Sequence, residues 1–332
     1  MIKRILPLLV ALTASPALGW GHQAHTAIDR AAIAALPADG PTFLRAYVDY
    51  IAASSTVPDG WRNASEPFSK IEEDPNHGWF RERFAFLKPI PRSRYAFLLA
   101  LYRENARVAR SDPAAAAWVN VRWTGTLPYA VMEQYGHLVA DMRQLRGVRA
   151  AGREKNAQFL EQICAFDVIR LGHYVGDGSQ PLHDSINSDG WRGPNPHGYT
   201  TGASIHSRFE SDYVGLIDLT EVDVSRHMAP LARARGDLFD AVLSYLDEAG
   251  DRMETVYQLD KRGAFAKAAD IDARALVYAR TGAGASLLRD LIVRAWGESQ
   301  QSSAVAVANP LDPLTPGFDP TTGSAPAPVD PD

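Results

Sequence analysis

The sequence predicts an all-α protein with a single multi-helix domain. Apolar residues recur at helical spacing along most of the chain, and few segments alternate between apolar and polar residues as half-buried strands do. The chain has 332 residues, of which 46% are hydrophobic, so it can bury a substantial core. No internal repeat is visible, and we expect one helical body.

Residues 1–19 have the pattern of a secretory signal peptide: a short basic start, an apolar run over 5–14 and small residues before a predicted cut between Gly19 and Trp20. The apolar run is too short to cross a bilayer as a helix. Cleavage would make Trp20 the first residue of a secreted or periplasmic protein. No later stretch is long and apolar enough to be a transmembrane helix.

Helical periodicity, with turn-forming residues between the periodic segments, divides the rest of the chain. The segments that we expect to be helical are 20–35, 41–54, 92–110, 127–148, 154–177, 203–213, 226–248, 251–259 and 264–296. The segments 57–62 and 72–80 are expected to be loops. The helix over 92–110 carries several large apolar residues and is expected to lie in the core, through Tyr95, Phe97, Leu98, Leu101 and Tyr102.

Composition constrains the ends and the chemistry. From residue 299 to 332 the chain is rich in Pro, Ala, Ser, Thr, Gly and Asp, which predicts a disordered tail. The formal net charge of −5 does not suggest a polybasic arm and disfavours tight nonspecific DNA binding, although a bound metal could supply positive charge. The one cysteine, Cys164, can form no internal disulfide and is expected to be a buried thiol.

The segment 173–210 concentrates residues of the types that bind zinc. Side chains four residues apart on a helix lie on the same face, and two pairs have this spacing. A third histidine lies on the loop between them. One such pair is usually structural, but two pairs with a histidine between them predict a metal site. The five residues are His173, Asp177, His183, His206 and Glu210.

Other candidates are weaker alone. A free amino group and carbonyl oxygen at Trp20 could chelate a metal, with His25 as a further ligand. Asp59 and Arg62 lie three residues apart in a turn-forming context, where a surface turn is an equally good interpretation. His77 lies in an expected loop, where most histidines are only solvated.

Two neighbouring motifs carry a resemblance to a known family. His173-Tyr-Val-Gly-Asp177 is followed by Gln180-Pro-Leu-His183, and the predicted mature chain begins with tryptophan. These features resemble the zinc-dependent phospholipase C / P1–S1 nuclease superfamily, in which the N-terminal tryptophan is a metal ligand. The resemblance extends over the chain from Trp20 to about residue 298.

The resemblance implies three zinc ions. The first would be bound by Asp59, His77, His173 and Asp177. The second would be bound by the amino and carbonyl groups of Trp20, by His25 and by Asp177 as a shared ligand. The third would be bound by His183, His206 and Glu210. It also implies a zinc-bridging hydroxide oriented by Asp59, with Arg62 donating to a phosphate oxygen.

The substrate is less sharply indicated. The short interval from Trp20 to His25, the Asp59–Arg62 spacing and the long interval between His183 and His206 resemble the nuclease branch, which predicts hydrolysis of single-stranded nucleic acid or 3′-nucleotides. No stable protein partner is implied.

Two features resemble the nuclease branch less well. Glu210 is the ligand type of the phospholipases, whereas nucleases generally have Asp there. After His77 the nuclease branch has an aromatic residue and a base-binding Asp, but this chain has Gly78, Trp79 and Phe80 and no carboxylate. Either aromatic residue could stack on a base. The alternatives are a zinc-dependent phospholipase C acting on glycerophospholipids and, in another class, a non-catalytic zinc-binding secreted protein, which would turn over no phosphodiester.

Overall fold

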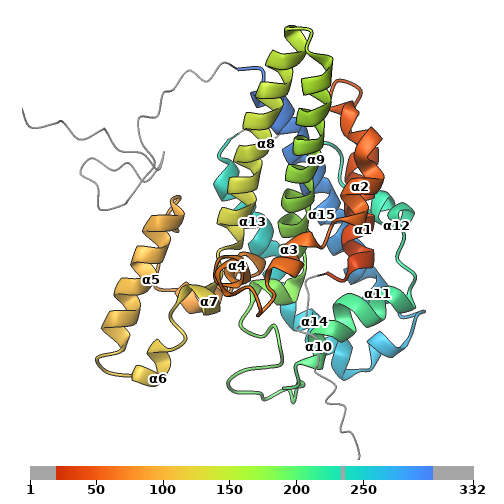
Figure 1. Ribbon diagram of the computed structural model, residues 1–332. Coiled ribbons are helices and arrows are strands. Elements are labelled where there is room, and N and C mark those ends of the chain that lie inside the picture. The colour runs from red at the N-terminus through yellow and green to blue at the C-terminus, as the bar shows by residue number, and fades with distance from the viewer. Residues whose placement is uncertain (1–19, 233–235, 302–332) are drawn as a thin grey trace, which may run out of the picture.

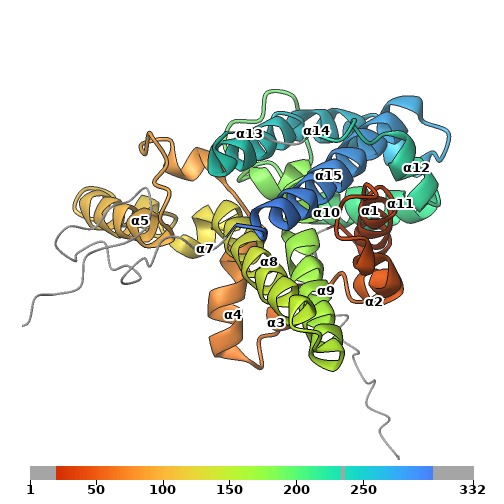
Figure 2. The same ribbon diagram turned by 90° about the horizontal axis from the view of Figure 1, so that it is seen from above.

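The computed structural model describes residues 20–232 and 236–301, and these residues are all-helical with no β-strand among them. The predicted signal peptide and residues 302–332 of the predicted tail lie outside the described residues. The described helices form a single body, as Figures 1 and 2 show. The all-α prediction is therefore confirmed.

The centre of the body is a pair of long helices, α8 (Leu127–Ala150) and α9 (Glu154–Asp177), that pack along each other. The C-terminal helix α15 (Ile271–Glu298) packs against both, and α1 (His22–Ala34) packs against α15 and α9. The last turns of α9, from Leu171 to Asp177, are completely buried between these helices. This burial holds the end of α9 rigidly in the core.

Shorter elements surround this centre. Those before α8 are η1 (Thr42–Tyr47), α2 (Val48–Ala53), α3 (Val57–Trp61), α4 (Pro67–Glu73), η2 (Asp74–His77), η3 (Arg81–Phe84), α5 (Arg94–Val108), α6 (Pro113–Ala116) and α7 (Val121–Thr124). Those after α9 are η4 (Pro181–Asp184), α10 (Ser204–Ser207), the π-helical turn η5 (Arg208–Asp212), α11 (Tyr213–Leu216), α12 (Glu221–Arg226), α13 (Leu238–Gly250), α14 (Met253–Lys261) and η6 (Ala264–Ala266).

Several predicted boundaries differ from the structure. The expected loop over 57–62 contains the short helix α3, whose first turn accommodates Pro58 because proline needs no backbone donor there. The expected helix over 226–248 is interrupted, because Pro230 and Gly236 disfavour a continuous helix. Helix α13 then begins at Leu238, where the Asp237 side chain accepts a hydrogen bond from the backbone of Asp240.

The expectation that the helix over 92–110 lies wholly in the core is wrong for one of its faces. Phe97 and Leu101 are buried, but Tyr95 and Tyr102 are 59% and 73% exposed. Helices α5 and α6 project from one side of the body (Figure 1). Because of this, only one face of α5 packs against other residues. Cys164 is buried, as expected.

Among the described residues, none of the helices combines the length and the apolar character needed to span a membrane.

Candidate metal centre

The structure brings the predicted ligands together in three buried groups that could each hold a metal ion. They are His25 with His173 and Asp177, Asp59 with His77 and His173, and His183 with His206 and Glu210. In each group the ligand atoms lie within 4.8 Å of one another. All eight of these side chains are thus assembled from distant parts of the sequence.

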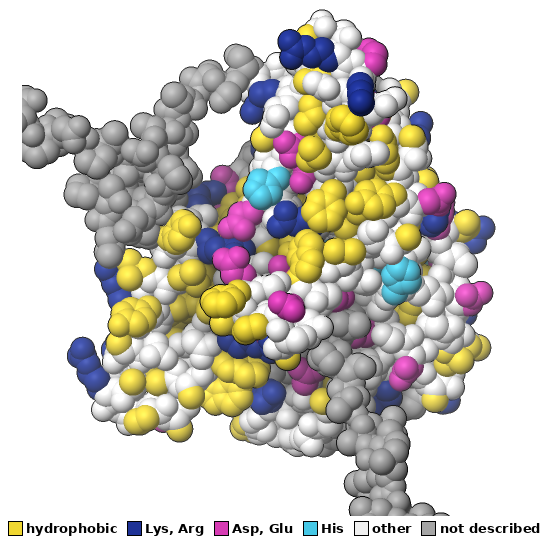
Figure 3. All heavy atoms as spheres, in the orientation of Figure 1, with side chains coloured by type: hydrophobic (Ala, Val, Ile, Leu, Met, Phe, Trp, Pro, Cys, Tyr) yellow, Lys and Arg dark blue, Asp and Glu magenta, His cyan; other side chains and the backbone are white. Residues whose placement is uncertain are grey.

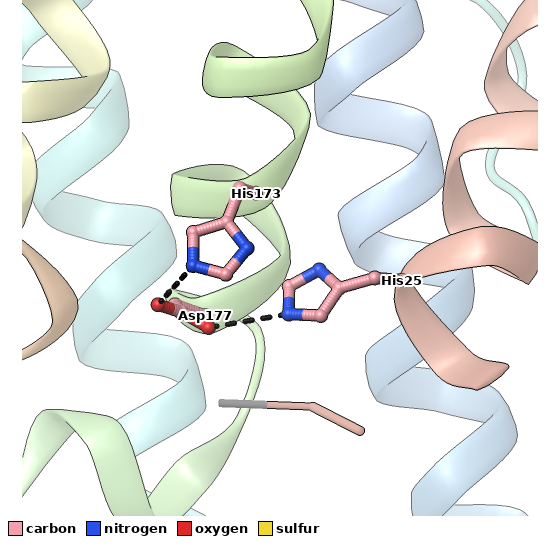
Figure 4. A group of neighbouring side chains, drawn as sticks. All are labelled: His25, His173 and Asp177. Atoms are coloured by element: carbon pink, nitrogen blue, oxygen red, sulfur yellow. Dashed lines mark ion pairs between the residues drawn. The ribbon is translucent and has the colours of Figure 1, made fainter. Parts of the chain in front are cut away.

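Asp177, the last residue of α9, lies at the centre of the first two groups. Its Oδ1 lies 3.4 Å from His25 Nε2, and its Oδ2 lies 2.9 Å from His77 Nδ1 and 3.5 Å from His173 Nε2. Figure 4 shows the carboxylate between the rings of His25, from α1, and His173, one turn earlier on α9. The two oxygens therefore face different histidines, as a carboxylate shared between two metal ions requires.

Two residues between His173 and Asp177 explain this close assembly. At Gly176 a Cβ atom would lie 2.6 Å from His25 Nδ1, so only glycine lets the His25 ring approach α9. The Tyr174 hydroxyl donates a hydrogen bond of 2.6 Å to Glu73, which in turn contacts His77. The spacing from His173 to Asp177 thus places two ligands on one face and two supporting residues on the others.

Asp59 completes this half of the centre from α3. Its Oδ1 lies 3.6 Å from His77 Nδ1 and 3.8 Å from His173 Nε2. The inner nitrogens of His77 and His173 are themselves only 3.1 Å apart.

The third group lies beyond the end of α9. His183 comes from η4, and His206 and Glu210 come from α10 and the π-helical turn. His206 Nε2 lies 3.1 Å from His183 Nε2 and 2.9 Å from Glu210 Oε2. Gln180 supports the group in two ways: it accepts a bond from the backbone of Leu182, which shapes the turn, and it donates to Glu210. π-Helical turns are often found at functional sites.

Four of the histidines use one ring nitrogen for an oxygen outside the centre. His173 Nδ1 contacts the Ser55 carbonyl at 2.9 Å, and His183 Nδ1 contacts the His77 carbonyl at 2.5 Å. His77 Nε2 contacts Glu73 at 3.1 Å, and His206 Nδ1 contacts Asp189 at 3.1 Å. An N–H donated to these oxygens leaves the lone pair of the other nitrogen facing inward, which is how metal-binding histidines are oriented.

The donor set fits metal ions. Two pairs of inward nitrogens lie at 3.1 Å, and neutral histidines in these tautomers would direct their lone pairs at each other. Furthermore, Asp59 Oδ2, Asp177 Oδ1 and both nitrogens of His25 are buried without a hydrogen-bond partner among the described residues. Leaving such groups unpaired is costly, and a cation between them would satisfy them. Nitrogen and carboxylate donors together suit zinc.

The charge states of the candidate ligands differ from one histidine to another. Burial lowers the pKa of His173 to about 4 and that of His183 to about 3, so both are neutral ligands at pH 7. Burial alone would raise the pKa of Asp177, but the imidazoles of His173 and His183 outweigh it and hold that pKa well below its usual value. His77 and His206 differ: although burial alone would lower both pKa values, hydrogen bonds to Asp177 and Glu73 raise that of His77, and the charge of Glu210 and the hydrogen bond to Asp189 raise that of His206 to about 10. Binding a cation at these two histidines would therefore release protons.

Trp20 is placed next to this assembly. Its indole is completely buried, packs on Phe209 with ring centroids 5.2 Å apart, and donates a hydrogen bond of 2.7 Å to Ser179. The following residue, Gly21, donates from its backbone to the Glu210 carbonyl at 3.4 Å. The start of the predicted mature chain is therefore anchored between the end of α9 and the π-helical turn.

Arg62 borders the centre and lines the pocket beside it. Its guanidinium lies 3.4 Å from Asp59 Oδ1 and donates to Asp74 Oδ1 at 3.0 Å. Asp74 also pairs with Lys70 at 2.8 Å and with Arg122 at 3.3 Å. Three cationic side chains thus share one buried carboxylate, which leaves this edge of the centre positive.

A pocket of about 510 Å³ opens onto the centre. Its walls include three of the histidines and two arginines, namely His77, His183, His206, Arg62 and Arg122. Phe80 lines the pocket, but Trp79 does not: Trp79 is 2% exposed and packs against Phe84 and Phe97 with centroid distances of 4.1 and 5.3 Å. The expected aromatic contact with a substrate is therefore restricted to Phe80, since the side chains of consecutive residues here point in different directions.

Two carboxylates of the site were not among the predicted residues. Glu73 precedes His77 by four residues, and this spacing is a signal that sequence reasoning can use. Asp189 lies 17 residues before His206 in an irregular loop, where no spacing rule applies. His22, His137, His197 and His227, which match no ligand of the resembled family, belong to none of the three ligand groups.

Comparisons of the chain with protein-family models, with curated proteins and with solved structures gave no match.

Proposed function

We propose that this chain is a secreted or periplasmic, zinc-dependent phosphodiesterase with the fold of the phospholipase C / P1–S1 nuclease superfamily, acting on single-stranded nucleic acid or 3′-nucleotides. The observation that carries the proposal is the joining of three buried ligand groups to a pocket whose wall contains Arg62. Metal ligands alone would support storage or structure as well. A guanidinium that contacts the ligand Asp59 and also faces the pocket favours phosphate chemistry.

The proposed ligand sets combine the buried groups with the ligands that the resemblance implies, namely Asp177 shared by two ions and the amino and carbonyl groups of Trp20. One zinc would be held by Asp59, His77, His173 and Asp177, a second by His25, Asp177 and the amino and carbonyl groups of Trp20, and a third by His183, His206 and Glu210. Zinc bound by these residues would supply Lewis-acid chemistry: it would lower the pKa of a coordinated water toward neutrality and neutralise charge on the phosphate and on the leaving oxygen.

Two side chains would then act on the reactants directly. Asp59 Oδ2 has no partner among the described residues, so it is free to accept a hydrogen bond from the attacking water and to orient it. Arg62, whose side chain is 17% exposed, can donate to a nonbridging phosphate oxygen from the pocket wall. Asp74 positions Arg62 through the 3.0 Å bond to its Nε.

The alternative substrate is a glycerophospholipid. Glu210, a ligand of the phospholipase type, is the observation that favours it. Against it, the pocket presents two arginines and two aromatic rings, Phe80 and Trp123, which suits an anionic ligand with a flat base better than a zwitterionic headgroup.

The proposal is tested with zinc-loaded protein that begins at Trp20. It is incubated in parallel with single-stranded DNA or RNA and with phosphatidylcholine vesicles, and the products are identified. We expect cleavage of nucleic acid to 5′-phosphate ends. Release of phosphocholine with intact nucleic acid would establish the phospholipase alternative, and bound zinc without turnover of either substrate would show a non-catalytic zinc protein.

A further inference from the structure

Positive charge is concentrated in one segment of this acidic chain. Residues 81–126 contain nine Lys or Arg and three Asp or Glu, a net charge of +6 in a chain whose total is −5. We call this segment the basic arm; it contains η3, α5, α6 and α7. The whole-chain charge therefore conceals a basic region, contrary to the expectation from composition. In Figure 3 dark blue Lys and Arg side chains lie among yellow hydrophobic ones over the arm, at the lower left.

The base of the arm is fixed to the pocket wall. Thr126 donates from its backbone to the Pro75 carbonyl at 2.7 Å, and Phe80 donates to the Thr124 carbonyl at 2.9 Å. Gly125, with a φ of +81°, allows this contact, because a Cβ there would lie 1.8 Å from the Gly78 oxygen. Arg122 and Trp123 consequently line the pocket.

Beside the pocket the arm and the loop after η4 form a cluster of aromatic rings and guanidinium groups. Trp118 and Trp123 have centroids 5.1 Å apart. Arg83 and Arg192 lie over Trp118, at 4.8 and 5.5 Å from its centroid, and Arg122 lies 4.9 Å from that of Trp123. We call these five residues the tryptophan–arginine rim. Glu82 joins its two sides by accepting bonds of 2.6 and 3.1 Å from Ser185 and Ile186.

The rim has more positive charge than the surrounding carboxylates neutralise. Within the described part of the chain, neither Arg83 nor Arg192 has an ion pair within 4.0 Å, and Arg122 shares Asp74 with Arg62 and Lys70. Burial and the nearby charge of Arg192 lower the pKa of Arg83 from its ordinary value. Guanidinium groups held close together repel one another unless an anion lies between them. The rim therefore suits a ligand that carries a negatively charged group.

We propose that the tryptophan–arginine rim is a binding subsite for the nucleotide next to the scissile phosphate, stacking its base on Trp123 and neutralising its phosphate with Arg122 and Arg192. This inference rests on the proposed function and deepens it, because it makes the preferred substrate a single strand of several nucleotides. Aromatic rings flanked by arginines are the means by which proteins bind single strands without reading their sequence. Trp123 is 37% exposed, which leaves part of its ring available to a base.

A lipid surface is a poorer occupant of the rim. A phosphatidylcholine headgroup has one phosphate and one quaternary ammonium, and the ammonium would have to approach three guanidinium groups to reach the tryptophans. A nucleic acid strand has one negative charge for every base, which matches the alternation of guanidinium groups and rings.

The test measures binding of a fluorescent phosphorothioate oligothymidylate, which resists cleavage, to the zinc-loaded protein by anisotropy over a range of salt concentrations. Trp123→Leu and Arg192→Gln are the test variants, and both residues are at the surface. Arg153→Gln is the matched control, because Arg153 is exposed at the far end of the α8–α9 pair. Turnover of a nitrophenyl phosphodiester, which has one phosphate and no neighbouring nucleotide, is measured in parallel.

We expect each rim variant to weaken oligonucleotide binding about tenfold. We also expect Arg192→Gln to reduce the slope of log affinity against log salt by about 0.7, the value for one phosphate of a single strand. Arg192→Lys keeps the charge and should restore most of the slope. The loss on oligonucleotide should exceed any loss on the small phosphodiester by at least about fivefold.

The outcomes separate the two proposals. Rim variants that bind oligonucleotide as tightly as Arg153→Gln does would overturn the subsite, even if the protein hydrolyses phosphodiesters. Rim variants that no longer bind phosphatidylcholine vesicles but still bind the oligonucleotide would also overturn the subsite. Weakened oligonucleotide binding in a protein that turns over no phosphodiester would uphold the subsite and remove the proposed catalytic function.

Discussion

The two halves of the metal centre bury their ligands equally but are built on different kinds of structure. In the half around Asp177, ligands come from α1, α3, η2 and the end of α9, and α9 itself is fixed between long helices. In the half around Glu210, they come from η4, α10 and a π-helical turn, all of them short segments. The first half is therefore part of the core, whereas the second depends on connections between helices.

The outer contacts of the two halves differ in the same way. His173 and His77 contact the Ser55 carbonyl and the buried Glu73. His206 instead contacts Asp189, whose side chain is 44% exposed. Both histidines of this half line the pocket, whereas among the described ligands of the other half only His77 does, and it comes from the short element η2. The comparison teaches that the long helices hold a shared carboxylate rigidly, while the short segments present ligands where a substrate enters. We expect the half around Glu210 to exchange its metal more readily.

The largest effect is expected from Asp177→Asn, because its two oxygens face different ligand groups. The variant should lose more than one zinc by elemental analysis and at least about 10³-fold in activity. Glu210→Gln is the matched change in the other half and should lose one zinc only. Retention of three ions in Asp177→Asn would show that the carboxylate is not shared and would remove the basis of the comparison.

A smaller effect is expected at Arg62, which borders both halves without being a metal ligand. Arg62→Gln should reduce kcat by about 10²-fold with an unchanged zinc content, because the change removes a donor to the phosphate and leaves the ligand groups intact. Steady-state kinetics and elemental analysis of the same preparation check this. Arg62→Lys keeps the charge but not the paired donors, and should recover only part of the activity. A loss of zinc in Arg62→Gln would instead give this arginine a structural role.

The outer carboxylates should show the difference in rigidity. Glu73→Gln should weaken zinc binding about 10- to 100-fold, because the amide no longer fixes the His77 tautomer. Asp189→Asn should have a smaller effect, since its half is supported by exposed structure. Competition with a zinc-binding dye measures both affinities, and Glu72→Gln, a change at the exposed neighbouring residue, is the control. Equal losses in Glu73→Gln and Glu72→Gln would contradict the assignment.

The smallest effect is expected at a carboxylate pair formed by Asp167 on α9 and Asp141 on α8. Burial and the neighbouring Asp141 raise the pKa of Asp167 to about 8 from an ordinary value of 3.8. The folded protein thus holds a proton there that the unfolded chain has released, so the stability linked to Asp167 is present at low pH and is lost as pH rises from about 4 to 8.

Asp167→Asn should remove this pH dependence. We expect the free energy of unfolding of metal-free protein at pH 8 to rise by about 1–2 kcal/mol, with a flatter profile between pH 5 and 8. Urea unfolding at several pH values measures this, with Asp212→Asn, at an exposed position, as the control. Destabilisation at pH 8 would mean that Asp167 is charged and paired in the folded state, as Asp177 is.

The sequence predicts the ligands much better than it predicts their surroundings. The spacings His173–Asp177 and His206–Glu210 depend on local helical geometry, and the structure confirms that both pairs share a buried group. Helix α9 also has its predicted bounds, because its period is regular throughout. The supporting contact from Asp189 was not predictable, since it depends on the path of an irregular loop.

Side-chain direction and local charge were the other gaps. Trp79 and Phe80 are adjacent, and only the three-dimensional course of the backbone shows that Trp79 joins the core while Phe80 faces the pocket. The aromatic residues of α5 suggest burial on both faces, but the helix packs on one side only and Tyr102 remains exposed. The net charge of the chain hides the basic arm because the residues outside it have an excess of eleven Asp or Glu over Lys or Arg.

The central claim is that Asp177 connects two of three metal ions, and anomalous X-ray scattering at the zinc edge tests it most directly. We expect crystals of zinc-loaded protein beginning at Trp20 to give three peaks. Two should lie on opposite sides of Asp177, and the third should lie among His183, His206 and Glu210. A single peak at Asp177, or peaks away from the three groups, would contradict the account.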